Sequence, residues 1–137
     1  MIKGSIVIDN YLKDLKIHKT PKTPEVDFNS TSGVFFISGV SVPENSQEFY
    51  EDVTKWIKSY VKKPAKNTTL IFKLTYISTS SIQFIYGLLM LLDKSAISSN
   101  IKVEWHYLED DIDMKEMGED LEDAISINFS LVEVKLG

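Results

Sequence analysis

The sequence predicts an α/β sandwich in which helices pack on a mixed sheet of four to five strands. Segments with β-type and helical patterns follow one another in the order β-β-α-β-α-β-α-β, which is typical of α/β layers. A length of 137 residues suits one domain, and 43% hydrophobic with 26% charged residues is typical of a cooperatively folding globular chain. We therefore expect a single domain over residues 1–137, with residues 1–19 as a leader or an extra edge strand.

The first half of the chain predicts a hairpin followed by a helix. Residues 20–24 hold two prolines, which favour extended backbone ahead of a strand at residues 26–28. A polar turn separates this strand from a second one at residues 34–38, as in an antiparallel hairpin. Asn45 then caps a helix. Its buried stripe recurs at helical spacing: Phe49, Val53, Trp56, Ile57 and Tyr60.

The second half alternates strands with helices. Residues 69–77 are β-rich and apolar, which favours a central strand covered on both faces. The apolar run in residues 80–95 is shorter than the ~20 residues that span a membrane, so we expect this segment to be a buried helix rather than a membrane-spanning one. Residues 101–107 alternate, so we expect one polar strand face made of Lys102, Glu104 and His106. A helical stripe at residues 114–124 and a last strand at residues 127–134 complete the order.

Composition excludes several classes of function. The absence of cysteine excludes disulfides, thiol nucleophiles and Cys-ligated zinc. All 15 basic residues are lysine and the formal charge is −5, so we do not expect a nucleic-acid partner. No phosphate-binding loop, dinucleotide fingerprint or nucleophile elbow is present, and we expect no enzyme activity, cofactor or metal. The N-terminus lacks a secretory signal, so we expect a cytoplasmic protein without membrane contact.

Two other functions remain open on the residues alone. A small hydrolase could use a carboxylate, Glu104 or Asp111, together with His106, which would require these groups to converge in a pocket. A structural dimerisation module could use a second apolar face of the helix at residues 80–95, made of Phe84, Leu88 and Leu91. Burial against a neighbouring helix explains that face equally well, and Gly87 would permit close backbone approach in either case.

Residues 109–123 hold nine acidic side chains and one lysine, a local charge of −8. Such a run forms either a solvated helix face or a surface that steers a basic partner.

Four consecutive hydroxyl residues stand where the central strand meets the apolar helix: Ser78, Thr79, Ser80 and Ser81. Ser80 and Gln83 have capping-box spacing, which places Thr79 just outside the helix. The carboxyl end of such a strand faces outward, so another protein could reach the Thr79 hydroxyl. A phosphate there would gain roughly 0.3–1 kcal/mol from the helix N-terminus and add about −1.5 to −2 charges. The other interpretation is that the cluster only caps the helix.

Four segments in a fixed order carry a family resemblance. They are residues 20–26, 41–46, 76–81, and 105–107 with the acidic run behind them. Together they resemble the SiaC-type regulatory phosphoproteins, bacterial partner-switch proteins with a fold similar to the STAS domains of anti-sigma-factor antagonists. The resemblance extends over most of the chain from about Thr20.

The resemblance implies a non-enzymatic adaptor that a dedicated kinase phosphorylates and a PP2C-like phosphatase restores. It further implies that the unmodified form binds and activates a diguanylate cyclase, or regulates another signalling enzyme, and so sets cyclic-di-GMP levels and biofilm behaviour. The phosphoacceptor falls on Thr79, with Ser78, Ser80 and Ser81 as alternates, and the family often has Asn where this chain has Ser78. The expected partner-binding residues flank this turn: Glu44, Asn45, Tyr76, Ser78, Ser80 and Phe84.

Overall fold

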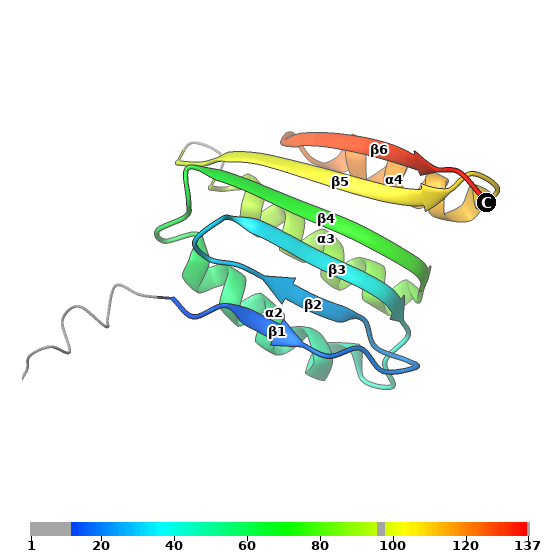
Figure 1. Ribbon diagram of the computed structural model, residues 1–137, viewed down its shortest axis with the longest axis horizontal. Helices are drawn as coiled ribbons and strands as arrows, with labels where there is room; N and C mark the ends of the chain where they lie inside the picture. The colour runs from blue at the N-terminus through cyan, green and yellow to red at the C-terminus, as the bar shows by residue number, and fades with distance from the viewer. Residues whose placement is uncertain (1–11, 96–97, 137) are drawn as a thin grey trace, which may run out of the picture.

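In the described part of the chain, one six-stranded sheet carries three helices on a single face (Figure 1). The computed structural model describes residues 12–95 and 98–136. The strands are β1 (Leu15–Ile17), β2 (Glu25–Phe28), β3 (Val34–Ser41), β4 (Asn67–Ile77), β5 (Asn100–Leu108) and β6 (Asn128–Val134). The helices are α2 (Ser46–Tyr60), α3 (Thr79–Asp93) and α4 (Ile112–Ala124). The α/β class is confirmed, whereas the predicted number of four to five strands is too low.

The sheet is mixed, and its strands lie side by side in chain order. β1, β2 and β3 pair antiparallel, which confirms the predicted hairpin. β3, β4, β5 and β6 pair parallel, and a helix connects each successive pair. The additional edge strand, β1, lies within residues 1–19, the segment expected as a leader or an extra edge strand. Its three residues are too few for alternation to be visible in the sequence.

The hydrophobic core fills the space between the sheet and the helices. One row of neighbouring side chains crosses the sheet on this face and is buried throughout: Phe28, Phe35, Leu70, Val103 and Phe129. Trp105 is fully buried, and its indole Nε1 donates to the Met114 carbonyl oxygen at 2.9 Å, which fixes α4 against β5. In α2 the buried aromatic in the second turn is Tyr50, and the predicted Phe49 is only half-buried.

No helix of the described residues lies on the opposite face of the sheet, so the prediction that β4 is covered on both faces is wrong. Along β4, Lys73 and Thr75 are exposed and Ile71 is half-buried. The strands from β3 to β6 follow one another in the same direction across the sheet. Because parallel crossovers are right-handed, all three helices must therefore lie on the same side. Within the described ranges, no helix has the length and apolarity needed to cross a bilayer.

Candidate functional site

The hydroxyl turn lies at the carboxyl end of β4, where the parallel strands end. The N–H of Ser78 donates to the Ser41 carbonyl oxygen at the end of β3 (2.9 Å), which fixes the point where the chain leaves the sheet. Ser78 has extended backbone and is the N-cap of α3, because its hydroxyl accepts from the N–H of Ser81 at 3.2 Å. The prediction that Ser80 caps the helix is therefore wrong, and Thr79 is the first residue of α3.

A β-bulge in β4 precedes this turn. Gly39 of β3 pairs with Leu74 and the next residue, Val40, pairs with Tyr76, so Thr75 is one residue too many in β4. Gly39 has φ +108°, a conformation that L side chains rarely adopt, and its carbonyl oxygen accepts from the Thr75 hydroxyl at 3.3 Å. Bulges bend a strand and change which face its following residues occupy, and they are rare in parallel pairs. Here Tyr76 is 63% exposed while its neighbour Ile77 is buried.

A network of side-chain hydroxyls connects this turn to the core and to α2. Its six members are Tyr50, Ser41, Ser81, Ser78, Ser80 and Ser46. Ser41 contacts Tyr50 at 2.6 Å and donates to Ser81 at 2.9 Å, both inside the core. Ser78 donates to Ser81 at 3.0 Å and lies 3.3 Å from Ser80, whose hydroxyl contacts Ser46 at 2.7 Å. The network joins the N-terminal ends of α2 and α3 to the end of β3, and burial raises the pKa of the Tyr50 hydroxyl.

Sequence reasoning missed three members of this network, namely Ser41, Ser46 and Tyr50. A signal for two of them exists, because Ser46 and Tyr50 share the buried face of α2 with Val53 and Ile57 at helical spacing. A serine and a tyrosine on that face require hydrogen-bond partners inside the protein.

Thr79 differs from the other three hydroxyl residues of the turn. Within the described part of the chain its hydroxyl has no hydrogen-bond partner, and the residue is exposed. Ser81 is fully buried, and the Ser78 and Ser80 hydroxyls contact the network. The turn thus presents one unoccupied hydroxyl at the first residue of a helix.

The other residues expected to bind a partner lie around the same turn with different exposures. Asn45 is the N-cap of α2, as predicted, and accepts from the N–H of Glu48 at 3.0 Å. Glu44 is highly exposed and pairs with Lys22 at 3.3 Å. Phe84 is half-buried, and its ring stacks on Tyr50 with centroids 5.7 Å apart.

The second apolar face of α3 packs against α2. Leu88 is buried and Leu91 is half-buried, in line with Phe84. A neighbouring helix therefore accounts for this face without a dimer. A β-carbon on Gly87 would meet none of the described atoms within 4 Å, so the expected close backbone approach is wrong.

Of the groups in the hydrolase alternative, Glu104 and His106 lie in contact, whereas Asp111 has a different role. His106 Nε2 lies 3.0 Å from Glu104 Oε1 on the open sheet face, and this hydrogen bond, followed by the nearby Lys102, lowers the pKa of Glu104. Asp111 instead caps α4 by accepting from the N–H of Met114. Across the described ranges, no three His, Asp or Glu side chains gather as a metal site would require.

The acidic run forms most of α4, whose buried residues face the sheet. A groove of about 380 Å³ separates α4 from α3, lined by Ile82, Gln83, Tyr86, Met117, Asp120, Leu121 and Ala124. Acidic residues recur on this side of α4 at three- and four-residue spacing: Asp113, Glu116, Asp120 and Asp123. The run is thus an exposed helix face that borders a groove.

Comparison with known proteins places the chain in a family. A model of SiaC family regulatory phosphoproteins matches residues 17–134. An uncharacterised protein of Pseudomonas aeruginosa strain UCBPP-PA14 is 27% identical over 121 residues, which cover 88% of this chain and 96% of that protein. The crystal structure of apo-SiaC from P. aeruginosa is 28% identical with a TM-score of 0.79, and the match covers 88% of this chain and 98% of that one.

A chain in the crystal structure of the diguanylate cyclase SiaD in complex with its activator SiaC, also from P. aeruginosa, is 27% identical with a TM-score of 0.82. That match covers 88% of this chain and all of the other. The matched range spans all four segments that carry the resemblance, and the structural matches agree with the α/β fold. The chain belongs to the SiaC family of regulatory phosphoproteins.

Proposed function

We propose that this chain is a non-enzymatic, cytoplasmic partner-switch adaptor whose unmodified form binds and regulates a diguanylate cyclase. A kinase adds a phosphate to Thr79 and thereby ends that binding, and a PP2C-like phosphatase removes the phosphate. The cyclase is the favoured partner because the related SiaC of P. aeruginosa is the activator of the cyclase SiaD. The observation that carries the proposal is the exposed Thr79 hydroxyl, which alone among the four of the turn has no partner in the described chain.

The hydrogen bonds of the neighbouring serines favour Thr79 as the acceptor. Ser81 lies entirely out of solvent, so a kinase could reach it only after the start of α3 unfolded. Modification of Ser78 would remove the O–H that donates to the Ser81 hydroxyl, and modification of Ser80 would place a phosphate at its 2.7 Å contact with Ser46. Phosphorylation of Thr79 breaks no contact of the hydroxyl network.

Electrostatics explain how a phosphate on Thr79 can change binding without changing the fold. The first N–H groups of α3 have no intrahelical partner and carry partial positive charge, so an anion at this helix end is stabilised by roughly 0.3–1 kcal/mol. The phosphate still adds about −1.5 to −2 charges to the surface that contains exposed Tyr76 and Glu44. A partner surface fitted to the neutral turn would then have to accommodate an unpaired dianion.

The acceptor assignment is tested by mass spectrometry after incubation with the cognate kinase. Wild type and Ser80→Ala should each gain one phosphate, and Thr79→Ala should gain none. Ser80→Ala is the matched control because it removes a neighbouring exposed hydroxyl from the same turn. Undiminished phosphorylation of Thr79→Ala would contradict the assignment.

The electrostatic switch is tested by titrating the cognate cyclase with Thr79→Glu and Thr79→Gln. The two side chains have nearly the same size and differ by one charge, so they separate charge from bulk. We expect Thr79→Glu to weaken binding at least 10-fold more than Thr79→Gln, with melting temperatures close to wild type for both. Equal affinities of the two variants for the cyclase would contradict the electrostatic switch.

A further inference from the structure

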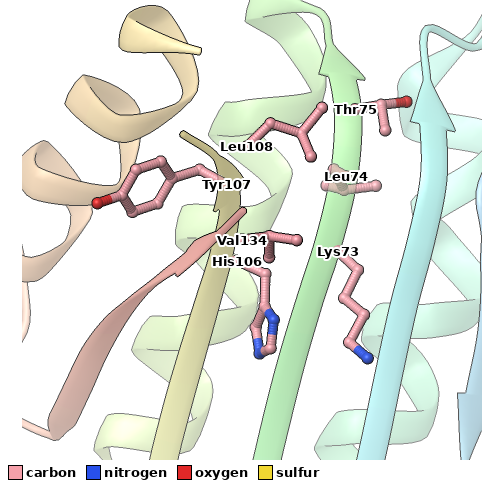
Figure 2. A pocket seen from close by; sticks show the side chains of 7 residues that line it. All are labelled: Lys73, Leu74, Thr75, His106, Tyr107, Leu108 and Val134. Carbon is pink, nitrogen blue, oxygen red and sulfur yellow. The ribbon is translucent and has the colours of Figure 1, made fainter. Parts of the chain in front are cut away.

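A notch opens on the helix-free face of the sheet where β4 and β5 part (Figure 2). Pairing between the two strands ends at Phe72 and Trp105, although β4 remains paired with β3 up to Ile77 and β5 with β6 up to Leu108. The notch encloses about 240 Å³, and the exposed apolar side chains at its mouth are Leu108 and Val134. The rest of its lining comes from Lys73, Leu74, Thr75, His106 and Tyr107.

The β-bulge at Thr75 lies within the separated stretch of β4, three residues after the last pair with β5. An inserted residue increases the local twist of a strand, which favours the separation. The facing backbone edges of the two strands therefore have no ladder partner in the described chain beyond Phe72 and Trp105. The notch is thus a built feature of the sheet at the carboxyl ends of its parallel strands, where ligands of α/β proteins commonly bind.

The volume of the notch indicates what kind of group can fill it. Sites for drug-sized molecules enclose roughly 300–1,000 Å³ and bury most of the ligand, whereas about 240 Å³ on an open face suits a single bulky side chain. Leu108 and Val134 are 37% and 38% exposed, so apolar area is available at the mouth. Protein interfaces commonly depend on a few large side chains that fill such hollows.

The positive charge of Lys73 at the rim indicates which side chain the partner places next to its apolar one. No carboxylate pairs with Lys73 in the described ranges, and its Nζ lies 5.7 Å from the centre of the Phe36 ring. The nearby Glu104 already contacts Lys102 at 3.5 Å and His106 at 3.0 Å. An unpaired lysine beside an apolar hollow favours a partner that places a carboxylate next to its apolar side chain.

The notch and Thr79 are close enough for one partner to cover both. Leu74 and Thr79 are five residues apart, which is at most about 17 Å of extended chain. A standard interface covers about 800 Å² on each partner, or roughly 28 Å across. The exposed Tyr76 lies between the two in sequence.

We propose that the notch receives one bulky apolar side chain of the regulated partner, flanked by an aspartate or glutamate that pairs with Lys73. This inference rests on the proposed function, because the partner is the diguanylate cyclase that the unmodified adaptor binds. It assigns the open sheet face, in addition to the Thr79 turn, to recognition of that partner.

The experiment is a calorimetric titration of the purified cognate cyclase with the full-length adaptor and its variants. Leu108→Glu places a charge at the apolar mouth, and Lys73→Glu reverses the rim charge. Ile112→Glu and Lys62→Glu are the matched controls, because each makes the same exchange at an exposed residue that does not line the notch. Since the substituted side chains reach solvent, all four variants should fold, and far-UV circular dichroism with melting temperature checks this.

We expect Leu108→Glu and Lys73→Glu each to weaken binding at least 10-fold and both controls to stay within 3-fold of wild type. If both notch variants bind with wild-type affinity while Thr79→Glu binds more weakly, the notch does not bind the partner and the proposed function stays intact. Weakened notch variants with unchanged Thr79→Glu would support the notch and contradict the switch. If Leu108→Glu instead abolished self-association in sedimentation and left cyclase binding unchanged, the occupant would be a second copy and the proposal would be wrong.

Discussion

Replacement of Ser78 tests whether its hydroxyl sets the start of α3. The hydroxyl accepts from the N–H of Ser81 at 3.2 Å, and alanine at this position would leave that N–H without an acceptor. We compare Ser78→Ala with Ser78→Asn, because asparagine is as good an N-cap as serine and alanine is a poor one.

The expected loss follows from the local geometry. Loss of a serine N-cap costs about 0.5–2 kcal/mol, and the buried position of Ser81 favours the upper half of this range, because water cannot replace the lost acceptor. No other hydroxyl is orphaned, since Ser81 keeps its bond from Ser41 and Ser80 keeps its contact with Ser46. We therefore expect Ser78→Ala to lower the free energy of unfolding by about 1–2 kcal/mol and Ser78→Asn to change it by less than about 0.5 kcal/mol.

Urea denaturation followed by circular dichroism measures both values. With an m-value of about 2 kcal/mol per molar, the midpoint should fall by roughly 0.5–1 M for Ser78→Ala and remain near wild type for Ser78→Asn, with unchanged slopes. An alanine variant as stable as wild type would show that the cap is not formed in solution. An asparagine variant as unstable as the alanine variant would show that the hydroxyl network, rather than capping, requires serine.

Two further predictions concern packing and pH. Gly118→Ala should lower the free energy of unfolding by about 1–3 kcal/mol in urea denaturation, because the added β-carbon would clash with the buried Trp105 indole. Gly87→Ala has open space around the added β-carbon and should raise the free energy of unfolding by about 0.5–1 kcal/mol. Equal effects of the two substitutions would contradict the packing of α4. The hydrogen bond from His106 lowers the pKa of Glu104 in the folded state. The ionised Glu104 therefore stabilises the fold above the unfolded pKa of about 4.5, and this stabilisation is lost as the pH falls through the folded pKa. Glu104→Gln should therefore lose less stability than wild type as the pH falls below about 5, and parallel pH profiles of unfolding midpoints would refute this.

Local patterns in the sequence predict most of the element types but not every boundary. The hairpin, the Asn45 cap and the alternating strand β5 depend on residues close together in the chain, and the structure has all three. The cap of α3 depends on where β4 ends, which is fixed by the bond from the N–H of Ser78 to Ser41, 37 positions earlier in the sequence. The capping-box spacing pointed to Ser80, and this long-range contact makes Ser78 the cap instead.

The bulge explains why the sequence locates the candidate site but does not predict which of its side chains are exposed. Leu70, Phe72 and Leu74 face the core, and strict alternation would bury Tyr76 and expose Ile77. The structure does the reverse, because the extra Thr75 shifts the alternation by one residue. Burial of an isoleucine side chain contributes about 1.5–3 kcal/mol, which favours the shifted arrangement.

The same inserted residue has two consequences for recognition. It brings Tyr76 to the surface beside the Thr79 turn, and it lies in the stretch of β4 that has left β5 and lines the notch. Its partner in the bulge is Gly39 of the neighbouring strand, whose φ of +108° disfavours any other residue. Because the cause lies in the register between two strands, the pattern of β4 alone could not reveal it. If the notch and the Thr79 turn bind one partner, a single local irregularity in the sheet has shaped both parts of that surface.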